Sequence, residues 1–222
     1  MQLAAASLIF IKHHTPNNRT WYYIFVFFAV SAISSIIEMV MAFENTNILE
    51  SYKLFSPIII IPGFYIFFLT WCYIAELMRP HWLTVKRTIL ILLPSLLVAI
   101  PIVVLSAMSE ISNIYSTAQL RAHISEFNVY IRIAFVALFL PYCIGLICMR
   151  YKHNNPEIQK YIDMLIICLV LMVGSYIVSR CMQYFVGYII HEVFYLMISV
   201  FIIYAEHYER LQVKKKKVRD YY

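Results

Sequence analysis

The residues best suited to chemistry in this sequence are four ionisable side chains inside long apolar stretches. They are two acids and two bases, namely Glu38, Arg132, Arg180 and Glu192. An ionisable group is costly to place among apolar residues, so one found there usually has a partner or a function. Because two acids match two bases, the set could neutralise itself.

Other chemical signatures are missing from the sequence. It contains no H-E-x-x-H, no Walker loop, no G-x-S-x-G and no G-x-G-x-x-G, and its 4 glycines are too few for phosphate-cradling loops. The 5 cysteines all lie in apolar runs without a C-x-x-C pair, which is typical of buried small hydrophobes. We therefore predict no catalytic residues, no metal, no cofactor and no enzyme activity.

The composition indicates which solvent surrounds these residues. Hydrophobic residues make up 62% of the chain and charged residues 14%, with a mean hydropathy of +0.74. Ordinary soluble domains have roughly 45–50% and about 25%, respectively. A soluble domain of 222 residues could not hide this much apolar surface. The chain is therefore predicted to be an integral membrane protein.

Six segments are long enough to cross a bilayer as helices. About 20 apolar residues cross roughly 30 Å of hydrocarbon, and only a helix satisfies its own backbone there. The segments are residues 21–43, 54–75, 88–108, 127–149, 161–184 and 186–205. Residues 1–11 reach only about 16 Å, so we expect a short or truncated first helix. The predicted fold is an all-α, seven-helix-like membrane bundle over residues 1–206, followed by a basic tail over residues 207–222. The prolines at 57, 62, 94, 101 and 141 should kink these helices.

The distribution of basic residues predicts the orientation. Fourteen of the 18 Lys and Arg residues fall in alternate connections, at residues 12–19, 79–87 and 150–160 and in the tail. Because basic residues favour the cytoplasmic side, the C-terminus is predicted to face the cytoplasm. Residues 44–53, 109–126 and the turn near Gly187 should then face outside. The predicted location is the cytoplasmic (inner) membrane.

This orientation places all four intramembrane charges in the outer third of the bilayer. Each lies four to six residues from the outer end of its segment, which is roughly 6–9 Å deep. Three interpretations remain open: independent snorkelling of the arginines beside a protonated Glu38, a structural interhelical pair, and a ligand pocket open to the outside. The short outer turn makes Arg180 and Glu192 the expected pair.

The basic tail has two interpretations. Its members are Arg210, Lys214, Lys215, Lys216, Lys217 and Arg219. They suit an anchor on anionic lipid, at roughly 1 kcal/mol per basic residue near the surface, or a connector to a cytoplasmic output module. The tail is too short for a DNA-recognition fold, so no nucleic acid is assigned to this chain.

One segment resembles a known family. A helix ending in Tyr73-x-x-Glu76-Leu77-x-Arg79-Pro80 is followed by Trp82-Leu83-Thr84-x-x-Arg87 and an apolar run with Leu93-Pro94. This pattern is similar to the membrane sensor half of bacterial membrane-bound AraC-type transcriptional regulators. Residues 127–132 resemble the opening of that family's fifth helix, and the likeness extends in outline over residues 1–213.

The resemblance implies a function and also shows two departures. The family carries a C-terminal pair of helix-turn-helix motifs and a complete first helix, whereas this sequence ends at Tyr222 and starts with a stub. We therefore expect a sensor module, either a fragment or a gene that lost both ends. It would pass a signal from a small outer ligand to the cytoplasm, with a homodimer as a further candidate state.

A small transporter or channel-like protein is the alternative function. A transporter would normally show internal repeats and discontinuous helices with polar groups at the midplane. Here the charges lie in the outer third and the inner half is nearly free of charge, which disfavours a continuous path.

Overall fold

The three-dimensional arrangement comes from a computed structural model, which describes residues 22–23, 25–33, 54–149, 156–182, 193 and 196–200. The regular elements in these ranges are helices. They are α4 (Pro57–Met78), α5 (Val85–Ala107), α6 (Thr117–Ala122), α7 (Phe127–Ala137), α8 (Phe139–Met149) and α9 (Pro156–Met182). Residues 25–33 are helical as well. The predicted all-α class is confirmed for this part of the chain.

Three helical segments of the described part are long and apolar enough to cross a membrane. They are Pro57–Met78 with 22 residues, Val85–Ala107 with 23, and Phe127–Met149, also with 23. These segments overlap the predicted spans at 54–75, 88–108 and 127–149, and they indicate a multi-pass membrane protein. The predicted span at 161–184 is helical as far as Met182. The predicted spans at 21–43 and 186–205 lie largely outside the described residues, as does the predicted stub at 1–11.

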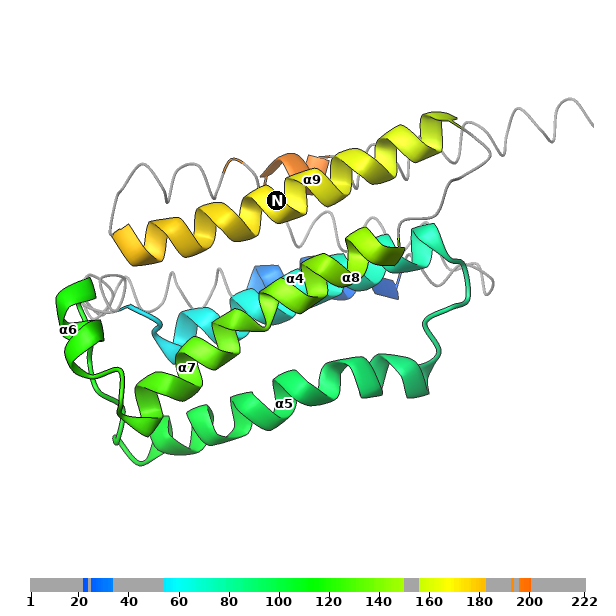
Figure 1. Ribbon diagram of the computed structural model, residues 1–222. Helices are drawn as coiled ribbons and strands as arrows, with labels where there is room; N and C mark the ends of the chain where they lie inside the picture. The colour runs from blue at the N-terminus through cyan, green and yellow to red at the C-terminus, as the bar shows by residue number, and fades with distance from the viewer. Residues whose placement is uncertain are drawn as a thin grey trace, which may run out of the picture.

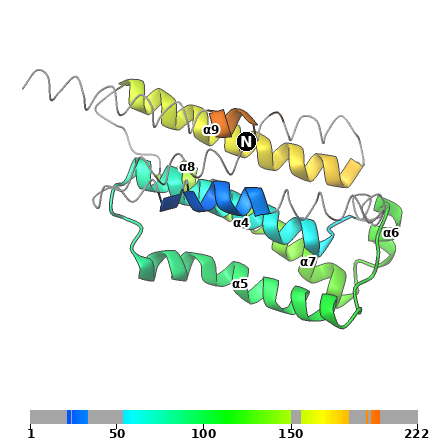
Figure 2. The same cartoon turned by 180° about the vertical axis from the view of Figure 1, so that it is seen from behind.

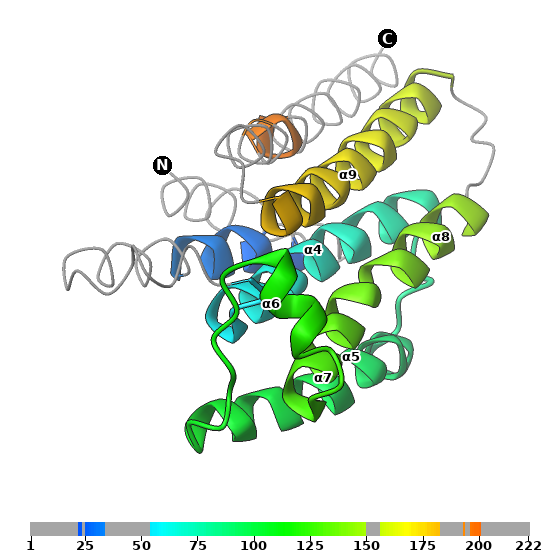
Figure 3. The same ribbon diagram turned by 60° about the vertical axis from the view of Figure 1, so that its left-hand side comes forward.

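Helix α4 occupies the centre of the bundle. It contacts α5, α7, α8 and α9, and Figures 1 and 2 show α5 and α9 on opposite sides of it. In its most apolar stretch of 18 residues, 56% of the residues are buried, whereas the corresponding value for α5 is 17%. The short helix α6 lies across one end of the bundle, as the oblique view in Figure 3 shows. The exposed apolar face of α5 suits lipid as its surroundings.

The helical stretch that contains Pro141 is interrupted, in line with the predicted effect of this proline. The apolar stretch 127–149 is divided at Leu138, where α7 ends and α8 begins. Pro141 has no N–H, so it cannot bond to the carbonyl four residues earlier, and its ring disfavours a regular helix at this point. Pro62, Pro94 and Pro101 lie inside α4 and α5, which continue through them.

Aromatic side chains hold α4 against α7 and α8. Phe64 is fully buried, and the centroid of its ring lies 4.9 Å from that of Phe135 and 5.1 Å from that of Phe139. The Trp71 Nε1–H donates to the Tyr142 carbonyl at 2.8 Å, and the Tyr142 hydroxyl donates to the Ile91 carbonyl at 2.5 Å. These two bonds link α4 to α8 and α8 to α5, so the polar ends of both rings are satisfied inside the bundle.

Candidate functional site

The candidate site is centred on Arg132, one and a half turns into α7. Its side chain is among the largest fully buried ones, with 2% of its surface exposed. The guanidinium donates from Nε to the Asn128 carbonyl at 3.0 Å and from Nη2 to Asn128 Oδ1 at 3.1 Å. It also donates from Nη2 to the Ser112 carbonyl at 3.0 Å and from Nη1 to the Phe55 carbonyl at 3.4 Å. Protein oxygens therefore replace the water that this charge lost on burial.

These acceptors come from three separate segments at one end of the bundle. Phe55 precedes α4, Ser112 lies between α5 and α6, and Asn128 lies in the first turn of α7. Phe55 has a φ of 56°, in the left-handed region that a bulky side chain rarely adopts. The preceding Leu54 N–H donates to the Ile114 carbonyl at 2.6 Å. Arg132 and this backbone bond together hold the entry to α4 against the α5–α6 connection.

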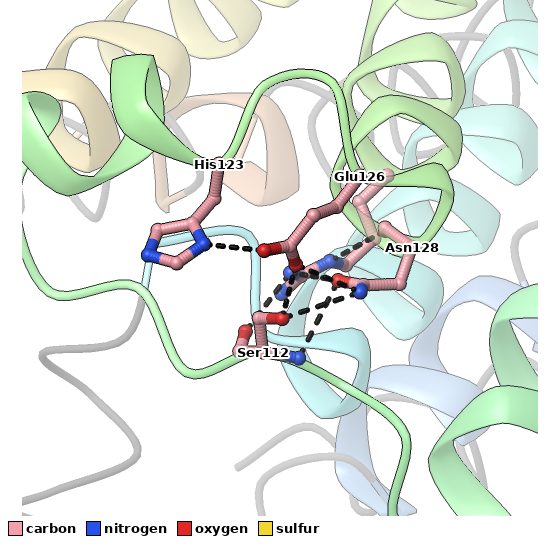
Figure 4. A network of polar contacts seen from close by, with 5 residues as sticks. Ser112, His123, Glu126 and Asn128 are labelled. Carbon is pink, nitrogen blue, oxygen red and sulfur yellow. Dashed lines mark hydrogen bonds and ion pairs between the residues drawn. The ribbon is translucent and has the colours of Figure 1, made fainter.

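A second layer of polar side chains surrounds the carboxylate of Glu126, directly before α7. The Ser112 hydroxyl donates to Glu126 Oε2 at 2.5 Å, and the Asn128 amide donates to the same oxygen at 3.2 Å. The Nδ1 atom of His123 lies within hydrogen-bond distance of Oε1. Figure 4 shows His123 on one side of this carboxylate and Asn128 on the other, with Ser112 below it. We call Ser112, His123, Glu126, Asn128 and Arg132 the polar network.

The polar network is open to water on one side. The side chains of His123 and Glu126 are 46% and 38% exposed, whereas Arg132 below them is buried. Hydrogen bonds from Ser112 and His123 lower the pKa of Glu126 to about 2 from its ordinary value of 4.5, because they favour the charged carboxylate. The network thus presents an ionised acid and an imidazole to solvent, over a buried cation.

The lowered pKa of Glu126 predicts how stability depends on pH. A carboxyl with a depressed folded pKa contributes stability that is present above its unfolded pKa of 4.5 and is lost as the pH falls toward about 2. We expect this group to cause no change between pH 7 and pH 5, and a progressive loss below about pH 4.5. Thermal unfolding of the purified protein in detergent, followed by circular dichroism, measures it. The Glu126→Gln variant should lose stability less steeply in that acid window, and equal slopes for both proteins would contradict the prediction.

Of the four predicted intramembrane charges, the structure describes the side chain of Arg132. Glu38 and Glu192 lie outside the described residues. Arg180 belongs to α9, but its side chain is outside the described part, so its pairing with Glu192 stays a prediction. Arg132 is buried, and its guanidinium donates to protein oxygens. Its hydrogen bonds within the described part go to carbonyl and amide oxygens.

Four members of the polar network were not among the residues predicted from the sequence, namely Ser112, His123, Glu126 and Asn128. A local signal did exist, since Asn128 and Arg132 are four residues apart and share one face of a helix. Glu126 directly precedes an apolar helical run, where an acid is favourable because of the helix dipole. Ser112 carried no such signal, because its approach depends on the path of the α5–α6 connection.

A second buried charge organises the opposite end of the bundle. Glu76, in the last turn of α4, is only 3% exposed. Its carboxylate accepts from the His81 N–H at 2.7 Å and from the Leu83 N–H at 3.2 Å. His81 has a φ of 63°, so the chain turns sharply there before α5 begins. Glu76 thus fixes the backbone of the turn between α4 and α5.

The remaining site predictions concern the tail and metals. Arg210, Lys214, Lys215, Lys216, Lys217 and Arg219 lie outside the described residues, so the tail's role stays a prediction. Among the residues that the structure describes, no three His, Cys, Asp or Glu side chains come together as a metal site would require. Cys72, Cys143, Cys148 and Cys168 are free thiols.

Comparisons with family models, with characterised proteins and with solved structures give no match for this chain. The polar network therefore has to be interpreted from its own geometry. The similarity of residues 73–94 and 127–132 to membrane-bound AraC-type regulators stays a prediction.

Proposed function

We propose that this chain is a polytopic membrane sensor that passes a signal from the outer side of the cytoplasmic membrane to the cytoplasm. The observation that carries the proposal is the polar network, in which a solvent-open acid and imidazole lie directly over buried Arg132. Arg132 also holds three segments of the bundle together. A ligand bound at the exposed layer would therefore act on residues that position the helix ends.

The proposed orientation follows from the charges at the two ends of the bundle. The α4–α5 turn at residues 79–87 carries three basic residues, and the polar network lies at the other end of these helices. The positive-inside rule then puts the network outside and the basic tail in the cytoplasm. In this proposal the tail rests on anionic lipid and connects to the output, which would be a transcriptional regulator of AraC type.

Transmission of a signal requires an element with two positions. Helix α7 starts at the polar network and leads, through the break at Leu138, into α8, which ends on the opposite side of the bundle. A ligand that draws Ser112 or Asn128 away from Arg132 would break hydrogen bonds of the Arg132 guanidinium near the start of α7. The last helix, predicted at residues 186–205, would carry the movement into the tail.

The rival function, a small transporter, has one feature in its favour. The break at Leu138 makes the α7–α8 span discontinuous, as in many transporters. The polar groups near the break are already satisfied, however, because Trp71 and Tyr142 bond to carbonyls of neighbouring helices. The surrounding side chains are phenylalanines. A substrate path would need open polar groups at this depth, so we favour the sensor.

A fused output tests the proposal. A helix-turn-helix DNA-binding domain is joined after Tyr222, and transcription from its promoter is measured in cells. We expect Glu126→Gln and Asn128→Ala each to change transcription by about fivefold or more, as typical coupling between sites does. Inserting four glycines between Ala205 and Leu211 should abolish that dependence. A topology reporter inserted within residues 117–122 should read external.

Two results would overturn this function. One is a cytoplasmic reading at residues 117–122, which would reverse the orientation. The other is transcription in the Glu126→Gln and Asn128→Ala variants that equals transcription in the natural protein, at equal amounts of membrane protein. The matched control is Gln119→Ala, since Gln119 is an exposed residue of α6 whose side chain accepts from the Tyr115 N–H, outside the polar network.

A further inference from the structure

The turn between α4 and α5 exposes a group of cations at one end of the bundle. Arg79, Lys86 and Arg87 are all exposed, and they lie within nine residues of one another along the chain. No acidic residue follows Glu76 until Glu110. We call residues 79–87 the basic turn.

The nearby acid does not neutralise this surface. The Glu76 carboxylate is buried, and its two oxygens accept from the backbone N–H groups of His81 and Leu83. The acid thus fixes the backbone of the basic turn from inside, while the cationic side chains lie outside. A pre-ordered backbone lowers the entropic cost of binding a ligand at this turn.

Internal contacts also position the cations. The Arg87 guanidinium lies over the Trp82 ring, 5.7 Å from its centroid, and its Nη1 donates to the Trp82 carbonyl at 3.0 Å. Thr84 Oγ1 accepts from the Arg87 N–H at 3.3 Å and caps α5. Lys86 lies in the first turn of α5, where the helix dipole adds partial positive charge.

Exposed apolar side chains of α5 lie within the basic turn and directly after it. Val85 is 76% exposed, and Ile89 and Leu90 are 55% and 56% exposed. They lie on the first two turns of α5, which is one of the helices able to cross a membrane. A molecule bound by the cations would therefore have an exposed apolar surface beside its charged part.

From this arrangement we infer that the basic turn binds the phosphate headgroup of an anionic phospholipid. The cations supply charge for the phosphate, and Arg in particular matches phosphate oxygens through its planar fork. The exposed aliphatic residues of α5 supply a surface for the acyl chains. This site is separate from the polar network and from the basic tail, and it does not depend on the proposed sensor function.

Native mass spectrometry of the full-length protein in detergent tests this inference. The probes are a short-chain phosphatidylglycerol, a phosphatidylcholine with the same chains, and inorganic phosphate. All proteins carry Gln at positions 214–217, so that the tail lysines do not obscure the result. We expect tighter binding of phosphatidylglycerol than of phosphatidylcholine. The triple variant R79Q/K86Q/R87Q should weaken phosphatidylglycerol binding by about fivefold per charge removed.

Control variants separate the basic turn from charge in general. Arg121→Gln removes an exposed cation from α6, at the other end of the bundle, and should leave lipid binding unchanged. Arg79→Lys keeps the charge and should retain most of the binding. Circular dichroism confirms that each variant is helical. The inference is wrong if the triple variant binds phosphatidylglycerol as the parent does, or if inorganic phosphate binds as tightly as the lipid.

Discussion

Replacing Arg132 with leucine should lower the free energy of unfolding by about 2–6 kcal/mol. The substitution leaves the carbonyls of Phe55 and Ser112 without the donor that now reaches them, and each buried acceptor without a partner costs about 1–3 kcal/mol. Leucine also cannot donate to the Asn128 amide oxygen, which then loses one of its hydrogen-bond donors. Unfolding by sodium dodecyl sulfate in mixed micelles, followed by circular dichroism, measures the change.

The control for this prediction is the exposed Arg121 on α6. Arg121→Leu removes the same charge, but we expect it to shift stability by no more than about 0.5 kcal/mol, as surface changes usually do. Arg132→Lys should fall between leucine and the natural residue, because an ammonium lacks the planar fork that reaches several acceptors at once. Equal stabilities for the Arg132 and Arg121 variants would show that the buried guanidinium does not hold this end together.

Replacing Glu76 with alanine should cost about 3–6 kcal/mol at the opposite end of the bundle. The carboxylate accepts two backbone N–H groups, and hydrogen bonds to charged groups contribute about 1.5–3 kcal/mol each. Without it, the N–H groups of His81 and Leu83 lose their acceptor. The α4–α5 turn should then open, and proteolysis between Arg79 and Thr84 should become faster.

Two variants make this result specific. Glu76→Gln keeps one carbonyl oxygen as an acceptor, so it should lose less stability than Glu76→Ala. Glu110→Ala removes an exposed acid near the other end of α5 and should behave like the natural protein. If proteolysis of the turn were as slow in Glu76→Ala as in Glu110→Ala, Glu76 would not be what orders it.

Arg132 and Glu76 stabilise the connections between helices in a similar way. Arg132 and Glu76 are both almost fully buried, and the described contacts of each are with backbone or amide groups of connecting segments. Connections between helices leave carbonyls and N–H groups that no helix satisfies. A buried guanidinium can satisfy several carbonyls, and a buried carboxylate can satisfy several N–H groups. In the described part of the chain, a buried charged side chain therefore binds the connecting segments at each end of the bundle.

The sequence by itself determined the class of the protein and three of its candidate spans. Solvent preference is a sum over about 20 consecutive residues, so no knowledge of tertiary contacts is needed to detect it. The same holds for the division of the stretch 127–149, because Pro141 acts on its own helix. The unusual position of Arg132 was also visible, since a lone base in an apolar run is rare.

Only the tertiary structure decided what Arg132 binds. The sequence directed attention to acids on other helices, because opposite charges are the partners that residue types reveal. Three of the four acceptors are instead backbone carbonyls, including one 77 residues away, and every residue has such a carbonyl; the fourth is the amide oxygen of Asn128. Likewise, Glu126 gained its importance from a serine 14 residues earlier in a connecting segment. The sequence records the cost of burying a charge, but the oxygens that offset this cost are brought together only by the path of the chain.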